Sequence, residues 1–111
     1  MAYDVELAAR IRALVAGEPG LTEQRMFGGI AFLVGGNMAL TASGRGGIMV
    51  RVDPDESDAL TVSTAATIVV MRGREMRGWL RVDAEHLEAQ PELAAWVERS
   101  IAFARSLPAK R

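Results

Sequence analysis

The sequence predicts an α+β fold of two layers, an antiparallel sheet of about five strands packed against helices at both ends of the chain. Apolar residues recur at helical spacing near the two termini and alternate with period two in the middle. Glycine-rich turns, too short for a parallel crossover, separate the alternating segments. The length of 111 residues fits one domain, so we expect residues 1–111 to form a single domain.

The first predicted element is a helix that begins after Asp4, a suitable N-cap, and ends near Gly17, a suitable C-cap. Pro19 and Gly20 prevent its continuation. Its apolar residues have the spacing of one helical face: Leu7, Ile11, Leu14 and Val15.

Three short strands are predicted next, over residues 30–34, 38–42 and 48–52. Their side chains are expected to alternate between two faces, with Ile30, Phe32 and Val34 on one side and Ala31 and Leu33 on the other, and residues 38–42 and 48–52 continue the period of two. Glycine-rich turns at 35–37 and 44–47 connect them, so we expect an antiparallel meander.

A short helix should follow, because Asp53 can cap it and Pro54 suits its first turn. We expect this helix to end near Leu60 and residues 61–67 to form a loop. Two further strands are predicted at 68–71 and 79–82.

The last element is the helix that begins at Pro91 and ends before Pro108. Its broad apolar stripe predicts burial against the sheet: Leu93, Trp96, Val97, Ile101, Ala104 and Leu107. Trp79 follows Gly78 and could either pack under the sheet or face a partner.

Composition excludes several classes of protein. The absence of cysteine rules out disulfides, thiolate zinc sites and a cysteine nucleophile. The 13 basic and 14 acidic residues give a net charge of −1, which disfavours a dedicated nucleic-acid coat. The longest apolar run, residues 30–34, is far shorter than the roughly 20 residues of a membrane span. We expect a soluble, cytoplasmic protein without a membrane partner.

The glycine clusters do not match a phosphate-binding motif. A P-loop needs a lysine beside its second glycine, and the one lysine is Lys110. A dinucleotide fingerprint leads into a helix, whereas residues 44–47 lead into a predicted strand. We interpret these glycines as hairpin turns and predict no cofactor.

His86 is the one histidine of the sequence, and Asp83, Glu85 and Glu88 lie near it. An imidazole oriented by Asp83 or Glu85 could act as an acid or base in a small enzyme or ligand-binding protein. The alternative is a solvated helical turn, since successive residues on one turn mostly point apart. We predict neither a catalytic set nor a metal site here.

Four arginines lie within ten residues whose one acid is Glu75: Arg72, Arg74, Arg77 and Arg81. They could bind nucleic-acid phosphates or an acidic partner. Alternatively, they are solvent-facing charges that protect a hairpin edge from unwanted pairing. Trp79 is the one aromatic residue among them that could stack on a base, so nucleic acid is a possible but not a favoured partner.

Residues 25–32, Arg-Met-Phe-Gly-Gly-Ile-Ala-Phe, and residues 73–79, Gly-Arg-Glu-Met-Arg-Gly-Trp, together with the last helix, resemble the N-terminal domain of the TfoX/Sxy family. We interpret six motif residues as fold markers: Met26, Phe27, Gly28, Gly29, Gly78 and Trp79. The two adjacent glycines would admit the chain to the sheet through a geometry closed to larger residues. Met26 and Phe27 would pack where the first helix meets the sheet.

The resemblance implies a non-enzymatic regulatory module, since the family is associated with the regulation of natural competence. It also implies dimers, and it makes this chain a member without the second domain of longer relatives. Our leading hypothesis is an interaction module that forms a homodimer and binds an unidentified protein. The alternatives are a nucleic-acid accessory factor that uses the arginines, and a ligand-binding protein or enzyme that uses His86.

Overall fold

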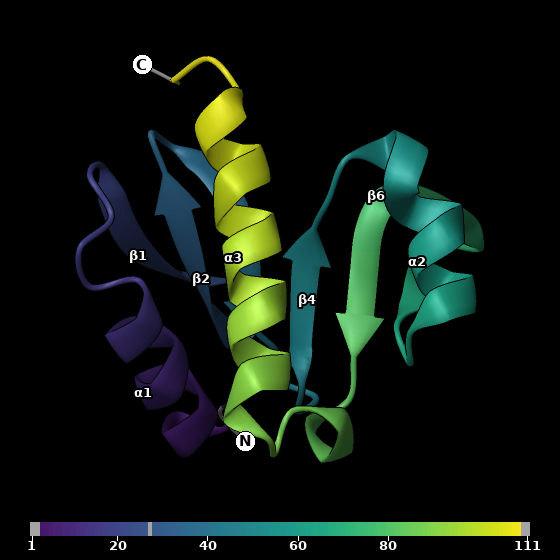
Figure 1. Cartoon of the computed structure of the whole chain (residues 1–111), viewed down its shortest axis with the longest axis horizontal. Helices are drawn as coiled ribbons and strands as arrows, with labels where there is room; N and C mark the ends of the chain where they lie inside the picture. The colour runs from purple at the N-terminus through teal and green to yellow at the C-terminus, as the bar shows by residue number, and fades with distance from the viewer. Residues whose placement is uncertain (1–2, 27, 110–111) are drawn as a thin grey trace.

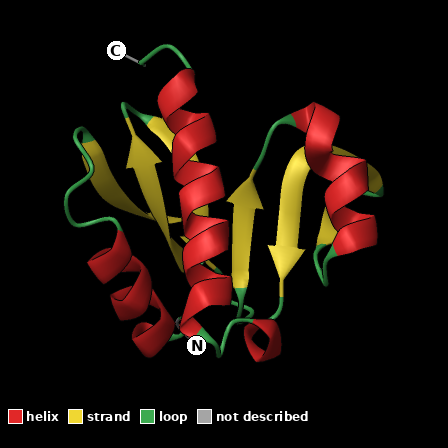
Figure 2. Cartoon of the chain, in the orientation of Figure 1, coloured by secondary structure: helices red, strands yellow, loops and turns green. Residues whose placement is uncertain are grey.

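The computed structural model describes residues 3–26 and 28–109 of the chain. Three α-helices, two 3-10 turns and six strands follow one another along it (Figures 1 and 2). In order they are α1 (Val5–Leu14), β1 (Leu21–Met26), β2 (Gly29–Val34), β3 (Asn37–Ala42), β4 (Ile48–Arg51), η1 (Pro54–Glu56), α2 (Ser57–Ser63), β5 (Thr67–Met71), β6 (Arg74–Val82), η2 (Ala84–His86) and α3 (Gln90–Ser106).

The strands form one antiparallel sheet in the order β1-β2-β3-β4-β6-β5. Strand β6 lies between β4 and β5. After β4 the chain therefore first forms the outer strand, β5, and then returns to form β6 beside β4. Helices α1 and α3 lie against one face of the sheet, and α2 lies beside β5 and β6 (Figure 1). The α+β class and the packing of both terminal helices are therefore confirmed.

The core lies between α3 and the central strands. Val50 of β4 lies opposite Leu80 of β6, and both side chains are fully buried. Leu93 and Val97 of α3 and Ile11 of α1 are buried in the same cluster. Alternate strand residues thus meet the apolar stripes of the helices, as the period-two pattern predicts. No helix of the described ranges is long and apolar enough to cross a membrane.

Strand β1 was not predicted. Its six residues, Leu-Thr-Glu-Gln-Arg-Met, are mostly exposed and have no apolar alternation. The strand is held by its full register with β2, from Leu21 opposite Val34 to Met26 opposite Gly29. Pairing with a neighbour, and not burial of its own side chains, therefore defines this edge strand.

Three predicted boundaries were wrong. Helix α1 ends at Leu14 with Val15 as its C-cap, and not near Gly17. Helix α2 continues to Ser63 instead of ending near Leu60, so part of the expected loop is helical. Strand β6 begins at Arg74 instead of Trp79, and its exposed first half pairs with β5. An irregularity interrupts that pairing, since Ile68 lies opposite Leu80 while Val69 lies opposite Met76. This bulge hides the strand period in the sequence.

The adjacent motif glycines are required for two different reasons. Gly28 has a φ of +77°, in the left-handed region that side chains disfavour. At Gly29 a β-carbon would lie 2.3 Å from the carbonyl oxygen of Ala42, so the neighbouring backbone leaves no space for a side chain. Phe27, which precedes them, lies outside the described residues.

Candidate functional site

The most distinctive surface feature is the free edge of β5. This strand pairs with β6 on one side and ends the sheet on the other. Its sequence, Thr-Ile-Val-Val-Met, has no charge and no proline. Val70 is 59% exposed and Met71 is 45% exposed. An uncharged, β-branched edge is a template for pairing with another strand.

The opposite edge of the sheet has a different chemistry. Strand β1 presents Glu23 and Arg25, both exposed. The carboxylate of Glu23 accepts two hydrogen bonds from Arg12 of α1, at 2.7 and 2.9 Å. Charged side chains of this kind protect an edge from pairing. The sheet therefore has one protected edge and one unprotected edge.

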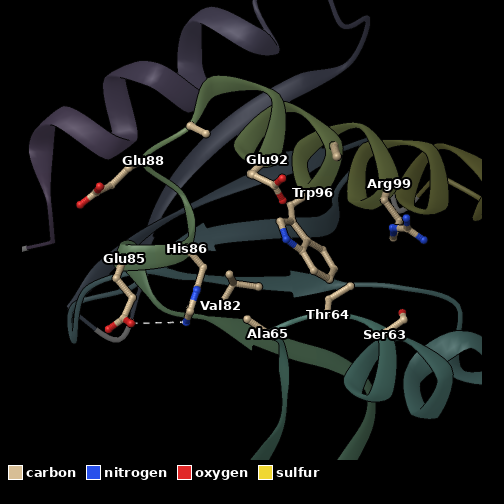
Figure 3. Close-up of a pocket in the computed structure, with 12 residues that line it drawn as sticks. Ser63, Thr64, Ala65, Val82, Glu85, His86, Glu88, Glu92, Trp96 and Arg99 are labelled. Carbon is tan, nitrogen blue, oxygen red and sulfur yellow. Dashed lines mark ion pairs between the residues drawn. The ribbon is translucent and has the colours of Figure 1, made fainter.

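A groove of about 520 Å³ lies between the α2–β5 loop, η2 and the first turns of α3 (Figure 3). Trp96 lines it, and Arg99 lies over the indole ring at 5.7 Å. His86 and Glu92 also line it. A ligand-binding protein or enzyme that uses His86, the alternative hypothesis from the sequence, would have its site in this groove.

The surroundings of His86 resemble a solvated turn. Its Nε2 lies 3.6 Å from a carboxylate oxygen of Glu85, and both side chains are exposed (Figure 3). Asp83, the other proposed orienting residue, lies 3.6 Å from Arg81. Within residues 3–26 and 28–109, no three histidine or acidic side chains converge as metal ligands would.

The four clustered arginines have different environments. Arg72 and Arg74 are exposed at the tip of the β5–β6 hairpin. Arg77 donates a hydrogen bond to the carbonyl of Pro54 at 3.0 Å. Arg81 donates to the carbonyl of Gly46 at 2.8 Å and is half-buried. Two of the four thus connect β6 to neighbouring segments.

The two motif residues of β6, Gly78 and Trp79, have structural contacts. Gly78 has a φ of +90°, and its buried N–H donates to the hydroxyl of Ser57 at 2.6 Å. Trp79 is half-buried beside Arg51, whose guanidinium lies 5.3 Å from the centre of the indole ring and 5.6 Å from that of Phe103. Trp79 therefore joins β6, β4 and α3 through a shared cation.

We had expected Met26 to pack where α1 meets the sheet, and this prediction was wrong. Glu23 points toward α1, where it binds Arg12. Met26 is three residues further along the strand, so its side chain leaves the opposite face. There it lies near Thr41 and Met49, on the side of the sheet away from α1 and α3.

These features define a class of protein: a small α+β module with an unprotected sheet edge, whose motif residues organise the backbone. The chain belongs to the TfoX N-terminal domain family, since the model of that family matches residues 13–104. Comparison with curated proteins gives no match.

Proposed function

We propose that this protein is a non-enzymatic regulatory module that acts as a homodimer through its β5 edge. The observation that carries the proposal is the uncharged, exposed strand Thr67–Met71 at the end of the sheet. Membership of the TfoX N-terminal domain family supports the regulatory role. The partner in this proposal is a second copy of the chain, and the dimer is the form that binds a regulated protein.

The β5 edge is complementary to itself. When two copies pair in antiparallel fashion about Val69, Ile68 of one lies opposite Val70 of the other. Pairs of β-branched residues are favourable neighbours across strands. Arg72, the first charged residue beyond the strand, would lie opposite Ala66, so no like charges would meet. A two-fold dimer needs a surface that satisfies itself in this way.

Pairing would also remove an unfavourable exposure. The outer N–H and C=O groups of β5 would join a continuous twelve-stranded sheet, since each copy contributes six strands. Val70 and Met71 would lose much of their contact with water. Each fully buried side chain of this type stabilises an interface by about 1.5–3 kcal/mol at most.

The test is the molar mass in solution, measured by sedimentation equilibrium or light scattering over a range of concentrations. The native chain should have the mass of a dimer. Val70→Lys should shift the equilibrium to monomer, because it places a charge on the edge that must be desolvated on pairing. A monomeric native protein would contradict the proposal.

Val62→Lys is the matched control. Val62 lies on α2, is 87% exposed and does not belong to the β5 edge. It should leave the dimer intact, while circular dichroism should show that both variants are folded. If Val70→Lys remains a folded dimer, the two copies use another surface and the β5 assignment is wrong.

A further inference from the structure

The face of the sheet away from α1 and α3 contains a cleft. Val50 and Leu80 point toward α3, so their neighbours in the same strands, Met49 and Arg81, point to the other face. Thr41 lies opposite Met49 and is on that face too. Thr41 is only 4% exposed, although α1 and α3 lie on the other side. Part of its cover is Met38, whose sulfur accepts a hydrogen bond from the Thr41 hydroxyl at 3.4 Å.

The cleft has a volume of about 420 Å³, and both edge strands of the sheet contribute to its wall. Met26 comes from β1, Met49 from the centre and Met71 from β5. Ile68, Val69 and Val70 of β5 complete the apolar side. Methionine side chains are flexible and adapt to apolar ligands of different shapes. The volume lies within the range of about 300–1,000 Å³ found for small-molecule sites.

One end of the cleft is positively charged. The guanidinium of Arg81 donates to the hydroxyl of Ser43 at 3.2 Å and to the carbonyl of Gly46 at 2.8 Å. Both acceptors belong to the β3–β4 turn, which also carries the exposed Arg45. Its Nε lies 3.6 Å from a carboxylate oxygen of Asp83. A guanidinium has five N–H groups, so these three contacts fix Arg81 in position and leave donors on its two terminal nitrogens. The described residues that line the cleft include both arginines and no acid.

We propose that this cleft binds a small amphipathic carboxylate, with its carboxylate at Arg45 and Arg81 and its unbranched apolar chain among the methionines. Charge selects the head group, because Asp83 balances only Arg81, so that an anion can balance Arg45 and form charge-assisted hydrogen bonds with both guanidinium groups. Shape selects a small molecule over a peptide, because the edge strands β1 and β5 both wall the cleft and a long chain needs an open groove. This inference does not depend on the proposed dimer.

The experiment uses the full chain with methyl-13C methionine, titrated with decanoate below its micellar concentration. Methyl resonances are assigned by single Met→Leu variants. The signals of Met26, Met49 and Met71 should shift and saturate. Met38, whose sulfur lies 3.4 Å from the hydroxyl of Thr41, and Met76, which lies opposite Val69, are neighbours of the lining, so their signals should move less. Decan-1-ol and decylammonium, which share the chain but lack the carboxylate, should bind more weakly.

Two arginine variants separate the site from general attraction to cations. Arg45→Gln should weaken decanoate binding about three- to tenfold, the effect of losing a charge-assisted contact that is partly screened. Arg72→Gln removes an exposed arginine of the hairpin tip and should leave the affinity unchanged. A third variant, Met49→Glu, should abolish binding, with circular dichroism as the check on folding.

Several outcomes would overturn the proposal. They are the absence of a saturable shift with decanoate, equal binding of decylammonium, and shifts spread evenly over all assigned methionines. A response to an acidic apolar peptide but not to decanoate would show that the cleft accepts a protein segment instead. An unchanged affinity in folded Arg45→Gln and Arg81→Lys would remove the head-group assignment.

Discussion

Arg105, in the last turn of α3, donates two hydrogen bonds to the carboxylate of Glu18, which lies in the loop after α1. The nitrogen–oxygen distances are 3.0 and 2.6 Å. Glu18 is 10% exposed, while Arg105 remains 60% exposed. The pair joins the two terminal helical segments, which are 87 residues apart in sequence.

This ion pair predicts a pH-dependent stability. The hydrogen bonds from Arg105 lower the pKa of Glu18 below its ordinary value of 4.5. A lowered folded-state pKa means that the stabilisation is complete above the unfolded pKa and is lost as pH falls through the folded pKa. Arg105→Ala should therefore lower the thermal midpoint by a few degrees near neutral pH. The difference from the native chain should shrink as the pH falls below 4.5 and through the lowered pKa of Glu18, and a constant difference would show that Arg105 acts through packing.

The two adjacent motif glycines predict variants of unequal severity. Gly28→Ala should cost about 1 kcal/mol of unfolding free energy, because its left-handed φ strains a side chain while the surrounding space is open. Gly29→Ala should cost more than about 2 kcal/mol, because the β-carbon collides with the backbone of Ala42. Urea titrations of both variants provide the comparison. Equal costs would mean that β3 moves aside without penalty.

Two fully buried serines predict opposite responses to alanine. The hydroxyl of Ser57 accepts the hydrogen bond of the buried Gly78 N–H, so Ser57→Ala should cost about 1–3 kcal/mol. Ser100 only donates to the carbonyl of Val97 in its own helix. Ser100→Ala should be close to neutral, since alanine is the better helix former. Chemical denaturation of the pair tests the assignment, and a harmless Ser57→Ala would contradict it.

The environments of the four arginines predict weak binding to DNA, with an affinity that depends only slightly on salt concentration. Arg77 is held by the carbonyl of Pro54 and Arg81 is half-buried at the cleft, so Arg72 and Arg74, exposed at the hairpin tip, are the members of the cluster best placed to reach the phosphates of a duplex. The dependence of log K on log salt should have a slope of no more than about 2, because each phosphate contact contributes about 0.9. Anisotropy of a labelled duplex at several salt concentrations measures this. A slope near 4, reduced by Arg77→Ala, would make nucleic acid the leading partner.

The helices and central strands could be predicted because their buried residues recur in the sequence at the spacing of a helix or of a strand. Asp4 caps α1 as expected, accepting the N–H of Leu7 at 3.1 Å. The apolar stripe of α3 meets the sheet, and Trp96 is buried in the core. Strand β1 escaped prediction because a polar edge strand has no apolar alternation. The first half of β6 escaped because the bulge before Leu80 breaks the period.

The surfaces were harder to predict than the elements. The uncharged run Thr67–Met71 is visible in the sequence, but its place at the end of the sheet depends on β6 inserting beside β4. The four arginines form one group by their spacing in the sequence. In the structure, the bulge of β6 and the β3–β4 turn give them different environments. The cleft joins Met26 with Met71, which are distant in sequence and belong to the two edge strands, so their proximity is set by the tertiary structure.

The unlike edges of the sheet also set a limit on assembly. Once two copies join by β5, the outward ends of the joined sheet are both β1, with its Glu23 and Arg25. Growth by strand addition then stops, since the exposed ends are the ones that repel further strands. In the proposed dimer, pairing would cover an edge that otherwise favours fibres, so the strand that permits association would also limit the assembly to two copies.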